Sequence, residues 1–178
     1  MRKSVLITGG GARIGAALAR GLAEDGWTVI IHYFRSAEKA DSLAAEIKEA
    51  GGQAITVQGN LSVPQECDTL IERAVDVAGG PITALINNAS TFEEDTARDF
   101  SRATYDFHMD ANLRAPLILS QHFADQAEDG GAIINLGSVL SDVATPLLGA
   151  YAASKHAVKG FTDALRMELV RDKAPISV

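Results

Sequence analysis

The sequence has little of several features that would point to particular classes of protein. It contains one cysteine, Cys67, so it cannot form an internal disulfide. Acidic residues outnumber basic ones by 23 to 16, a net charge of −7, whereas a nucleic-acid-binding protein would favour a basic face. No apolar run approaches the roughly 20 residues of a membrane-spanning helix. We therefore expect a cytoplasmic protein with no nucleic-acid or membrane partner.

The sequence also shows no signal-peptide pattern and no internal repeat. The opening MRKSVLIT is basic and then apolar, but its apolar run is too short for a signal peptide. The chain has 178 residues, of which 47% are hydrophobic and 22% charged, as is ordinary for a globular protein. This length is typical of one domain with a substantial core, so we predict a single domain over residues 1–178.

What is present is an alternation of short apolar runs, rich in β-branched residues, with segments of helical periodicity. Ser36 is a candidate N-cap for the helix that follows the second run. Strands are predicted at 4–8, 28–33, 53–58, 84–88, 131–136 and 176–178, and helices at 14–24, from 37 to about 50, from 64, at 102–128 and at 151–171. This order predicts an α/β fold, a doubly wound parallel sheet with helices on both faces and ligands at the carboxyl ends of its strands.

The segment TGGGARIG, residues 8–15, lies between the first predicted strand and the first helix. The phosphate-loop pattern GxxxxGK[ST] fails because Ala16 and Ala17 occupy its last two positions, and GxGxxG fails because Ile14 replaces its third glycine. The spacing that fits is TGxxx(G/R)xG. Small residues would let a ligand approach the backbone, where N–H groups at the helix start attract an anion. The alternative is a glycine-rich turn that binds nothing.

A second motif supports the ligand-binding interpretation. In YAASK, Tyr151 and Lys155 are four residues apart on a predicted helix and therefore lie on one face. A lysine beside a phenol stabilises the phenolate, which suits tyrosine to proton transfer near neutral pH. Ser138 follows a predicted strand, where its hydroxyl could hold a substrate carbonyl oxygen. Alone, a tyrosine and a lysine at this spacing would more often be packing and a solvated charge.

Taken together, these motifs resemble the short-chain dehydrogenase/reductase family over nearly the whole chain. The matching elements, in family order and separation, are TGGGARIG (8–15), NNAS (87–90), Asn112 in ANLRAP, Ser138 and YAASK (151–155). Within the family, Arg13 and HYFRS (32–36) are most similar to the pteridine reductase branch. The resemblance implies a Rossmann-like, three-layer α/β/α fold and an NADP-dependent oxidoreductase.

The resemblance also implies catalytic roles. Tyr151 would protonate the reacting oxygen, and Lys155 would support it and bind the nicotinamide ribose. Ser138 would orient the reacting oxygen. Asn112 would support a proton relay through water, and the alternative is a polar residue in a helix that Pro116 kinks.

Cofactor contacts follow from the same resemblance. Asn60 stands where many relatives carry aspartate, which puts its contact with the adenine in doubt. The contacts implied are Gly9, Arg13, Ile14, Gly15, Tyr33, Arg35, Ser36, Asn60, Leu61, Asn88, Ala89 and Ser90, together with Tyr151 and Lys155.

The identity of the cofactor can be predicted from charge. NAD-binding sites usually place an acidic residue about 20 residues beyond the glycine turn, where it binds the ribose 2′-hydroxyl. Between Thr28 and Ala37 this chain has none and offers Arg35, with Arg13 inside the turn. Guanidinium groups bind phosphate well, so we expect NADP(H). Two solvated arginines are the alternative.

The substrate prediction is a small carbonyl compound, and more finely a pterin. Phe92 stands where pteridine reductases present an aromatic ring, which could stack on a flat heterocycle and serve, with Ser138 and Tyr151, as a substrate contact. Ser138 itself argues for a general ketone reductase, because pteridine reductases often carry aspartate there. The alternatives are therefore a reductase of 3-oxoacyl thioesters or other ketones, and a non-catalytic dinucleotide-binding module.

Four further expectations concern the end of the chain, self-association, the acidic loop and the histidines. Relatives continue past APISV with a substrate lid and a last strand, so we expect a C-terminally truncated form. They pair through the helices that correspond to 102–128 and 151–171, so we expect a homodimer or homotetramer. The acidic stretch FEEDTARD, residues 92–99, is predicted to be a solvated loop. The four histidines show no ligand spacing with Cys67 or a carboxylate cluster, so we predict structural or surface roles and no metal.

Overall fold

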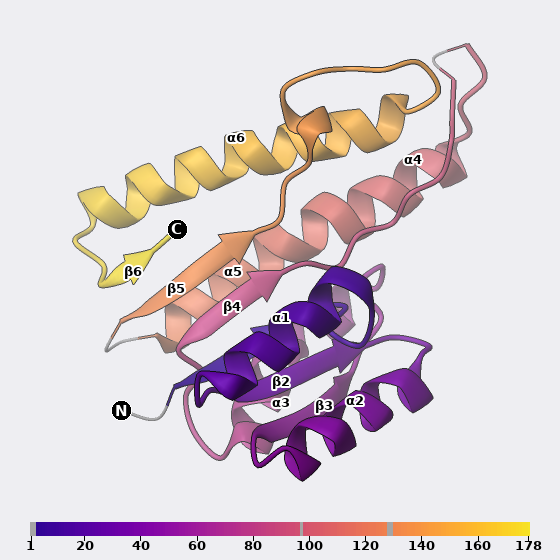
Figure 1. Ribbon diagram of the computed structural model, residues 1–178. Coiled ribbons are helices and arrows are strands. Elements are labelled where there is room, and N and C mark those ends of the chain that lie inside the picture. The colour runs from indigo at the N-terminus through magenta and orange to yellow at the C-terminus, as the bar shows by residue number, and fades with distance from the viewer. Residues whose placement is uncertain (1–2, 97, 128–129) are drawn as a thin grey trace.

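The structure is a computed structural model that describes residues 3–96, 98–127 and 130–178. In these ranges six parallel strands form one sheet in the order β3-β2-β1-β4-β5-β6 (Figure 1). The strands are β1 (Ser4–Ile7), β2 (Thr28–Tyr33), β3 (Gln53–Gln58), β4 (Ala84–Asn87), β5 (Gly131–Asn135) and β6 (Ile176–Ser177). The chain winds outward from β1 in both directions, which confirms the doubly wound parallel sheet expected from the sequence.

Helices cover both faces of this sheet. The helices α1 (Arg13–Glu24) and α2 (Ala37–Glu49) pack on one face, and α3 (Pro64–Ala78) and α5 (Ala115–Gln126) pack on the other, where α6 (Gly149–Arg171) adds Leu165. The helix α4 (Arg102–Met109) is joined to α5 by a π-helical turn, η1 (Asp110–Arg114). A short 3-10 helix, η2 (Val139–Ser141), precedes α6. The chain thus forms the three layers expected (Figure 1).

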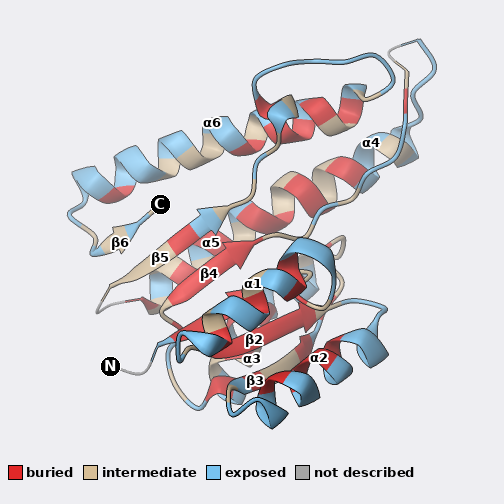
Figure 2. Ribbon diagram, in the orientation of Figure 1, coloured by how far each residue is buried: buried red, intermediate tan, exposed pale blue. Residues whose placement is uncertain are grey.

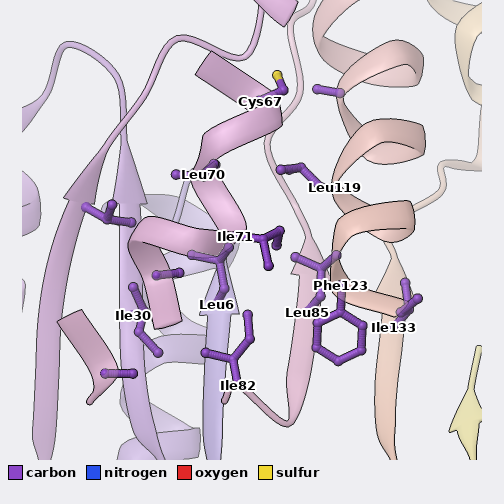
Figure 3. Packing of buried hydrophobic residues seen from close by; sticks show 14 of the residues in the cluster. Leu6, Ile30, Cys67, Leu70, Ile71, Ile82, Leu85, Leu119, Phe123 and Ile133 are labelled. Atoms are coloured by element: carbon purple, nitrogen blue, oxygen red, sulfur yellow. The ribbon is translucent and has the colours of Figure 1, made fainter. Parts of the chain in front are cut away.

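Alternation along the central strands divides the core into two clusters. On β1, Leu6 faces α3 and α5, whereas Ile7 faces α1 and α2. Leu6 is paired in register with Leu85 of β4, and Figure 3 shows the ring of Phe123 of α5 next to Leu85 on the side of Ile133. Because both faces are covered, β1, β2 and β4 are almost entirely buried (Figure 2), and such strands read as continuous apolar runs.

The predicted helical run 102–128 is interrupted by η1, and its last residue lies outside the described part of the chain. In an α-helix the N–H of residue 116 would donate to the carbonyl of Asn112, but Pro116 has no N–H. The π-helical turn therefore lies where that hydrogen bond is missing. Expected boundaries also moved: α6 begins at Gly149, two residues before Tyr151, and Ser36 lies at the N-cap of α2 without a capping hydrogen bond from its side chain.

The carboxyl ends of β1 and β4 meet where the strand order reverses, and the glycine turn and the NNAS segment follow these two strands. This is the edge at which α/β sheets bind ligands. No helix among the described residues combines the length and apolar character needed to cross a bilayer.

Candidate functional site

The glycine turn between β1 and α1 is held by hydrogen bonds from neighbouring segments. The Gly9 N–H donates to Nδ1 of His32 at 3.1 Å. The side-chain amide of Asn88 donates to the carbonyls of Thr8 at 2.8 Å and of Gly9 at 3.2 Å. The Thr8 hydroxyl accepts hydrogen bonds of 3.0 Å from the N–H groups of Asn88 and Ala89. Asn88 and Ala89, both expected at the cofactor, thus also shape the turn.

Packing within the protein accounts for two of the glycines. A Cβ at Gly15 would lie 2.5 Å from the Gly9 carbonyl oxygen and 2.7 Å from Nδ2 of Asn88. Gly9 has a φ of +61°, and a Cβ there would lie 3.1 Å from Cα of Ala89. The reason inferred from the sequence, access for a ligand, is therefore incomplete, because these glycines first let the turn, α1 and the NNAS segment meet.

The first turn of α1 carries a cation, Arg13, among small and apolar residues. Its leading N–H groups have no acceptor within the helix, so this end attracts an anion. Arg13 and Ile14 open the helix and are exposed, and Arg13 has a φ of +51°, which is uncommon outside glycine. Arg35, after the neighbouring strand β2, is also exposed and lies with its guanidinium carbon 4.8 Å from the ring centroid of Phe34. Two arginines thus follow the ends of adjacent strands.

The other residues expected around the adenine and its ribose lie at the carboxyl end of β2 and after β2 and β3. Oδ1 of Asn60 accepts a hydrogen bond from the Ser62 N–H at 3.1 Å, so that segment forms its own turn. Leu61 is buried, Tyr33 is half-buried and Ser36 is exposed. All of them lie at the same edge of the sheet as the glycine turn.

Lys155 is the buried cation of the site. The residue is only 4% exposed, and its Nζ donates a hydrogen bond to the carbonyl of Leu136 at 3.1 Å. Nζ also lies 5.9 Å from the ring centroid of the half-buried Tyr151. Burial lowers the pKa of Lys155. An ammonium has three N–H donors, so two more acceptors can be held here beyond the Leu136 carbonyl.

Ser138 follows β5 and lies at the N-cap of η2, which packs against α6. Its hydroxyl oxygen accepts a hydrogen bond from the Leu140 N–H at 3.1 Å, and its own N–H donates to Oγ of Ser141 at 3.0 Å. A hydroxyl that accepts one hydrogen bond still has its proton to donate. Ser138 is therefore fixed by local structure while it retains a donor.

Asn112 lies in the π-helical turn and is buried, and its amide is occupied by protein groups. Its Oδ1 accepts hydrogen bonds from the Thr91 N–H at 2.7 Å and the Ser90 hydroxyl at 3.2 Å. Its Nδ2 donates to the Thr91 carbonyl at 3.0 Å and to Oγ of Ser154 at 3.1 Å. The side chain therefore ties the segment after β4 to α6. A relay role for Asn112 stays a prediction. In an α-helix the main-chain carbonyl of Asn112 would pair with the N–H of residue 116, which Pro116 lacks.

Phe92 lies against Tyr151. The two ring centroids are 5.0 Å apart with planes at 76°, an edge-to-face contact, and Phe92 remains 57% exposed. The centroid of the buried His108 ring lies 6.0 Å from that of Tyr151, and Nε2 of His108 accepts a hydrogen bond from the Glu93 N–H at 3.0 Å. Two aromatic rings, those of Phe92 and His108, therefore pack against the phenol on which the expected chemistry depends.

The acidic loop is not wholly solvated, contrary to expectation. Asp95 is buried, and its Oδ2 accepts a hydrogen bond of 2.9 Å from the N–H of Ala150 in the first turn of α6. A carboxylate at a helix start satisfies an N–H that has no acceptor within the helix and complements the helix dipole. This acid therefore anchors the helix that carries Tyr151, whereas Glu93 and Glu94 are exposed as expected. Residue 97 of the loop lies outside the described residues.

Several residues that organise the site were not assigned such a role from the sequence, namely His32, Asp95, His108 and Ser154. Only His32 carried a signal, because a polar residue inside an apolar strand is normally buried with a hydrogen-bond partner. Within the described ranges, no three histidine, cysteine, aspartate or glutamate side chains gather closely enough to hold a metal ion.

Comparisons with known proteins agree with this architecture. The family model for short chain dehydrogenases matches residues 3–178. The chain is 33% identical over 171 residues to the 3-oxoacyl-[acyl-carrier-protein] reductase FabG of Staphylococcus aureus, covering 95% of this chain and 69% of that protein. A short chain dehydrogenase of Burkholderia cenocepacia, solved with NADP, superposes with a TM-score of 0.92 at 35% identity, covering 99% of this chain and 71% of the other. FolM alternative dihydrofolate reductase 1 of Brucella canis, also solved with NADP, superposes with a TM-score of 0.90 at 34% identity. The match covers 99% of this chain and 69% of the other.

Proposed function

Because the chain belongs to the short-chain dehydrogenase/reductase family, we propose that it is an NADPH-dependent reductase that acts on the carbonyl or imine group of a small substrate. The observation that carries the proposal is the ammonium of Lys155, which is buried beside Tyr151 at the edge of the sheet where the glycine turn lies. A buried charge costs free energy unless it is paired, and the Leu136 carbonyl satisfies one of its three donors. Cofactor hydroxyls would satisfy the others.

The residues present fit a nicotinamide dinucleotide. The N–H groups at the start of α1 would hold its pyrophosphate, and Arg13 and Arg35 would hold a 2′-phosphate on the adenine ribose. The two remaining donors of Lys155 would hold the hydroxyls of the nicotinamide ribose. When bound, this cofactor supplies the hydride, while the protein supplies position and electrostatics.

The protein's own groups would handle the proton. Tyr151 would donate the proton of its hydroxyl to the substrate oxygen, with the Lys155 ammonium nearby favouring the phenolate that remains. Ser138 would donate its hydroxyl hydrogen to the same oxygen and hold it in line. Asn112 would keep the segment after β4 against α6, and its main-chain carbonyl would hold the water that returns a proton to the site.

A spectrophotometric screen of NADPH oxidation tests this proposal. The substrates are dihydropterins, oxidised pterins, acetoacetyl thioesters and simple ketones. Turnover with at least one carbonyl or imine substrate is expected, with NADPH preferred to NADH. Known reductases that consume dihydropterins and acetoacetyl thioesters in the same assay serve as positive controls. If these controls work and the protein binds NADPH but turns over no substrate, the result would instead support the non-catalytic dinucleotide-binding module.

The preference for NADPH can be tested separately from turnover. Charge-assisted hydrogen bonds are worth about 1.5–3 kcal/mol, so Arg35→Ala should weaken NADPH binding by roughly 10- to 100-fold and leave NADH binding nearly unchanged. Arg13→Ala should act in the same direction. Arg20→Ala, on the exposed surface of α1, is the matched control and should change neither affinity. Equal affinities for NADH and NADPH in the parent protein, measured by fluorescence titration, would refute the assignment.

The substrate we propose is a pterin or a similar flat heterocycle. The exposed face of Phe92, 5.0 Å from the Tyr151 ring, could stack on a planar bicycle with the nicotinamide on its other side. Stacking contributes about 0.5–1.5 kcal/mol beyond burial, enough to orient a ring. The similarity to a FolM alternative dihydrofolate reductase supports this choice.

A reductase of 3-oxoacyl thioesters is the second candidate, and specific observations favour it. Ser138 suits a ketone oxygen, and the side chain of its neighbour Val139 is 76% exposed and could contact an apolar chain. The similarity to FabG points the same way. Phe92→Ala should reduce kcat/KM for pterins by at least roughly 2- to 10-fold while NADPH affinity holds, whereas Phe100→Ala, which changes another exposed phenylalanine, should alter neither. Turnover confined to keto-thioesters in all three proteins would favour the second candidate.

Self-association through the outer faces of α5 and α6 is the partner interaction we propose. An apolar stripe on α6 is formed by Ala157, Phe161, Ala164 and Leu165. Ala164 is exposed and the other three are half-buried, so part of the stripe serves the core and part faces outward. Further along the helix, Met167 and Val170 are 68% and 74% exposed. Light scattering should show a dimer or tetramer, and Met167→Glu should shift it toward the monomer. A monomeric parent at high concentration would refute the interface.

A further inference from the structure

The ring of His32 lies at the end of β2, between two segments assigned to the cofactor. It is 2% exposed, and both of its nitrogens have a backbone partner. Nδ1 accepts a hydrogen bond from the Gly9 N–H at 3.1 Å, and Nε2 lies 3.0 Å from the carbonyl oxygen of Gly59. The ring therefore bridges the glycine turn and the segment that follows β3.

The chemistry of these two partners determines the protonation of the ring. A backbone N–H can only donate, so Nδ1 must present its lone pair to Gly9. A backbone carbonyl can only accept, so Nε2 must carry the hydrogen directed at Gly59. Only the neutral tautomer protonated at Nε2 satisfies both, and either the charged ring or the other tautomer would break at least one bond.

The main chain of His32 reinforces the same link. Its carbonyl accepts the Gly10 N–H at 3.0 Å, so one residue accepts two consecutive N–H groups of the turn. Next to it, the carbonyl of Tyr33 accepts the Gly59 N–H at 2.9 Å. These bonds orient the glycine turn and the 59–61 segment relative to each other, and a dinucleotide that spans both depends on that orientation.

The charged groups nearest the ring come from α3. A Cβ at Gly59 would lie 3.4 Å from Nη2 of Arg73, which shows how closely this cation approaches, and Arg73 disfavours a second positive charge. The negative charge of Glu66 acts in the opposite direction and favours protonation of His32. The Glu66 carboxylate also accepts a hydrogen bond from the Asn60 N–H at 2.7 Å. Burial, the largest effect, lowers the pKa of His32 to about 4, so the ring stays neutral in ordinary buffers.

We infer that His32 is a positioning residue of the cofactor site, whose neutral ring holds the glycine turn and the 59–61 segment in the arrangement that binds the adenosine half of a dinucleotide. The inference rests on the proposed function. It also assigns a purpose to a polar residue within an otherwise apolar strand: a ring of this size joins two backbones that an aliphatic side chain would leave unpaired.

Titration with NADPH tests the effect on binding. His32→Phe keeps a ring of similar size but leaves the Gly9 N–H and the Gly59 carbonyl without partners, and we expect NADPH affinity to fall by at least tenfold. His122→Gln, which changes a histidine on α5 that lies 3.6 Å from Asp68, is the control and should bind like the parent. A folded His32→Phe variant, verified by circular dichroism, with parental NADPH affinity would overturn the inference.

A second measurement on the unmodified protein needs neither activity nor a folded variant. The ¹⁵N chemical shifts of the histidine rings should show that the ring of His32, assigned by through-bond correlation, is neutral with its hydrogen on Nε2 at pH 6. A ring that carries hydrogen on Nδ1, or that is charged at pH 6, would overturn the inference. If the parent bound no dinucleotide, the proposed function would fail while these shifts would still decide the geometry.

Discussion

Acidification should destabilise the folded protein through His32 in a way that can be isolated. The ring has an ordinary pKa of 6.5, which burial lowers to about 4 in the folded state. Between these values the unfolded chain binds a proton that the folded chain does not bind. Stability therefore falls as the pH falls from about 6.5 to about 4, and this group adds no pH dependence above that window.

The size of the effect follows from the shift. The difference between 6.5 and about 4 is about 2.5 pKa units, and each unit corresponds to about 1.36 kcal/mol, which gives about 3 kcal/mol over the whole window. Most of it, about 2–3 kcal/mol, should be lost by pH 4.5. Because a domain is stable by only about 5–15 kcal/mol, the loss is readily measured.

The assay is urea unfolding at a series of pH values between 7.5 and 4.5, for the parent and for His32→Phe. The variant is expected to be less stable at pH 7 because two backbone groups lose their partner. Its stability should nevertheless decline less between pH 7 and pH 4.5, and the difference between the two curves isolates His32, since the carboxylates titrate in both proteins. Parallel curves for parent and variant would show that the ring is not buried as a neutral base, and the reasoning would be refuted.

Three other predictions test the site. Tyr151→Phe should reduce turnover by about 10²–10⁴-fold and leave NADPH binding nearly intact, whereas Lys155→Ala should impair both, as measured by kinetics and fluorescence titration; a Tyr151→Phe variant with most of its activity would contradict the mechanism. Gly15→Ala should lower the thermal midpoint and the NADPH affinity, because its Cβ would lie 2.5 Å from a backbone oxygen, while Gly21→Ala, which meets nothing within 4 Å in the same helix, should be neutral or stabilising. Asp95→Ala should cost about 1 kcal/mol of unfolding free energy by loss of the helix cap, and Asp95→Asn, which keeps an acceptor, should cost less; equal losses in the two variants would argue against a capping role.

Much of the fold could be predicted because the strands of a parallel sheet covered on both faces are continuous apolar runs in the sequence. Runs such as SVLI and TVIIHY are buried over nearly their whole length, so their apolar and β-branched residues identify them as strands. The interruption at 110–114 was foreseeable in part, since Pro116 removes a specific helical hydrogen bond. That the backbone responds with a π-helical turn was not foreseeable, because it depends on what packs around Asn112.

In the candidate site, too, some features could be predicted from the sequence and others depend on tertiary contacts. Glycine spacing and the interval between Tyr151 and Lys155 are properties of the chain itself, so the sequence alone was enough to predict a cofactor turn, a tyrosine as proton donor and a cation beside it. Which groups hold them in place was decided by tertiary structure. Asp95 reaches the start of α6 from 55 residues away, and His32 reaches Gly9 and Gly59 across 23 and 27 residues. A hydrogen bond between distant residues leaves no periodicity in the sequence, since it exists only once the strands and helices have brought its donor and acceptor together.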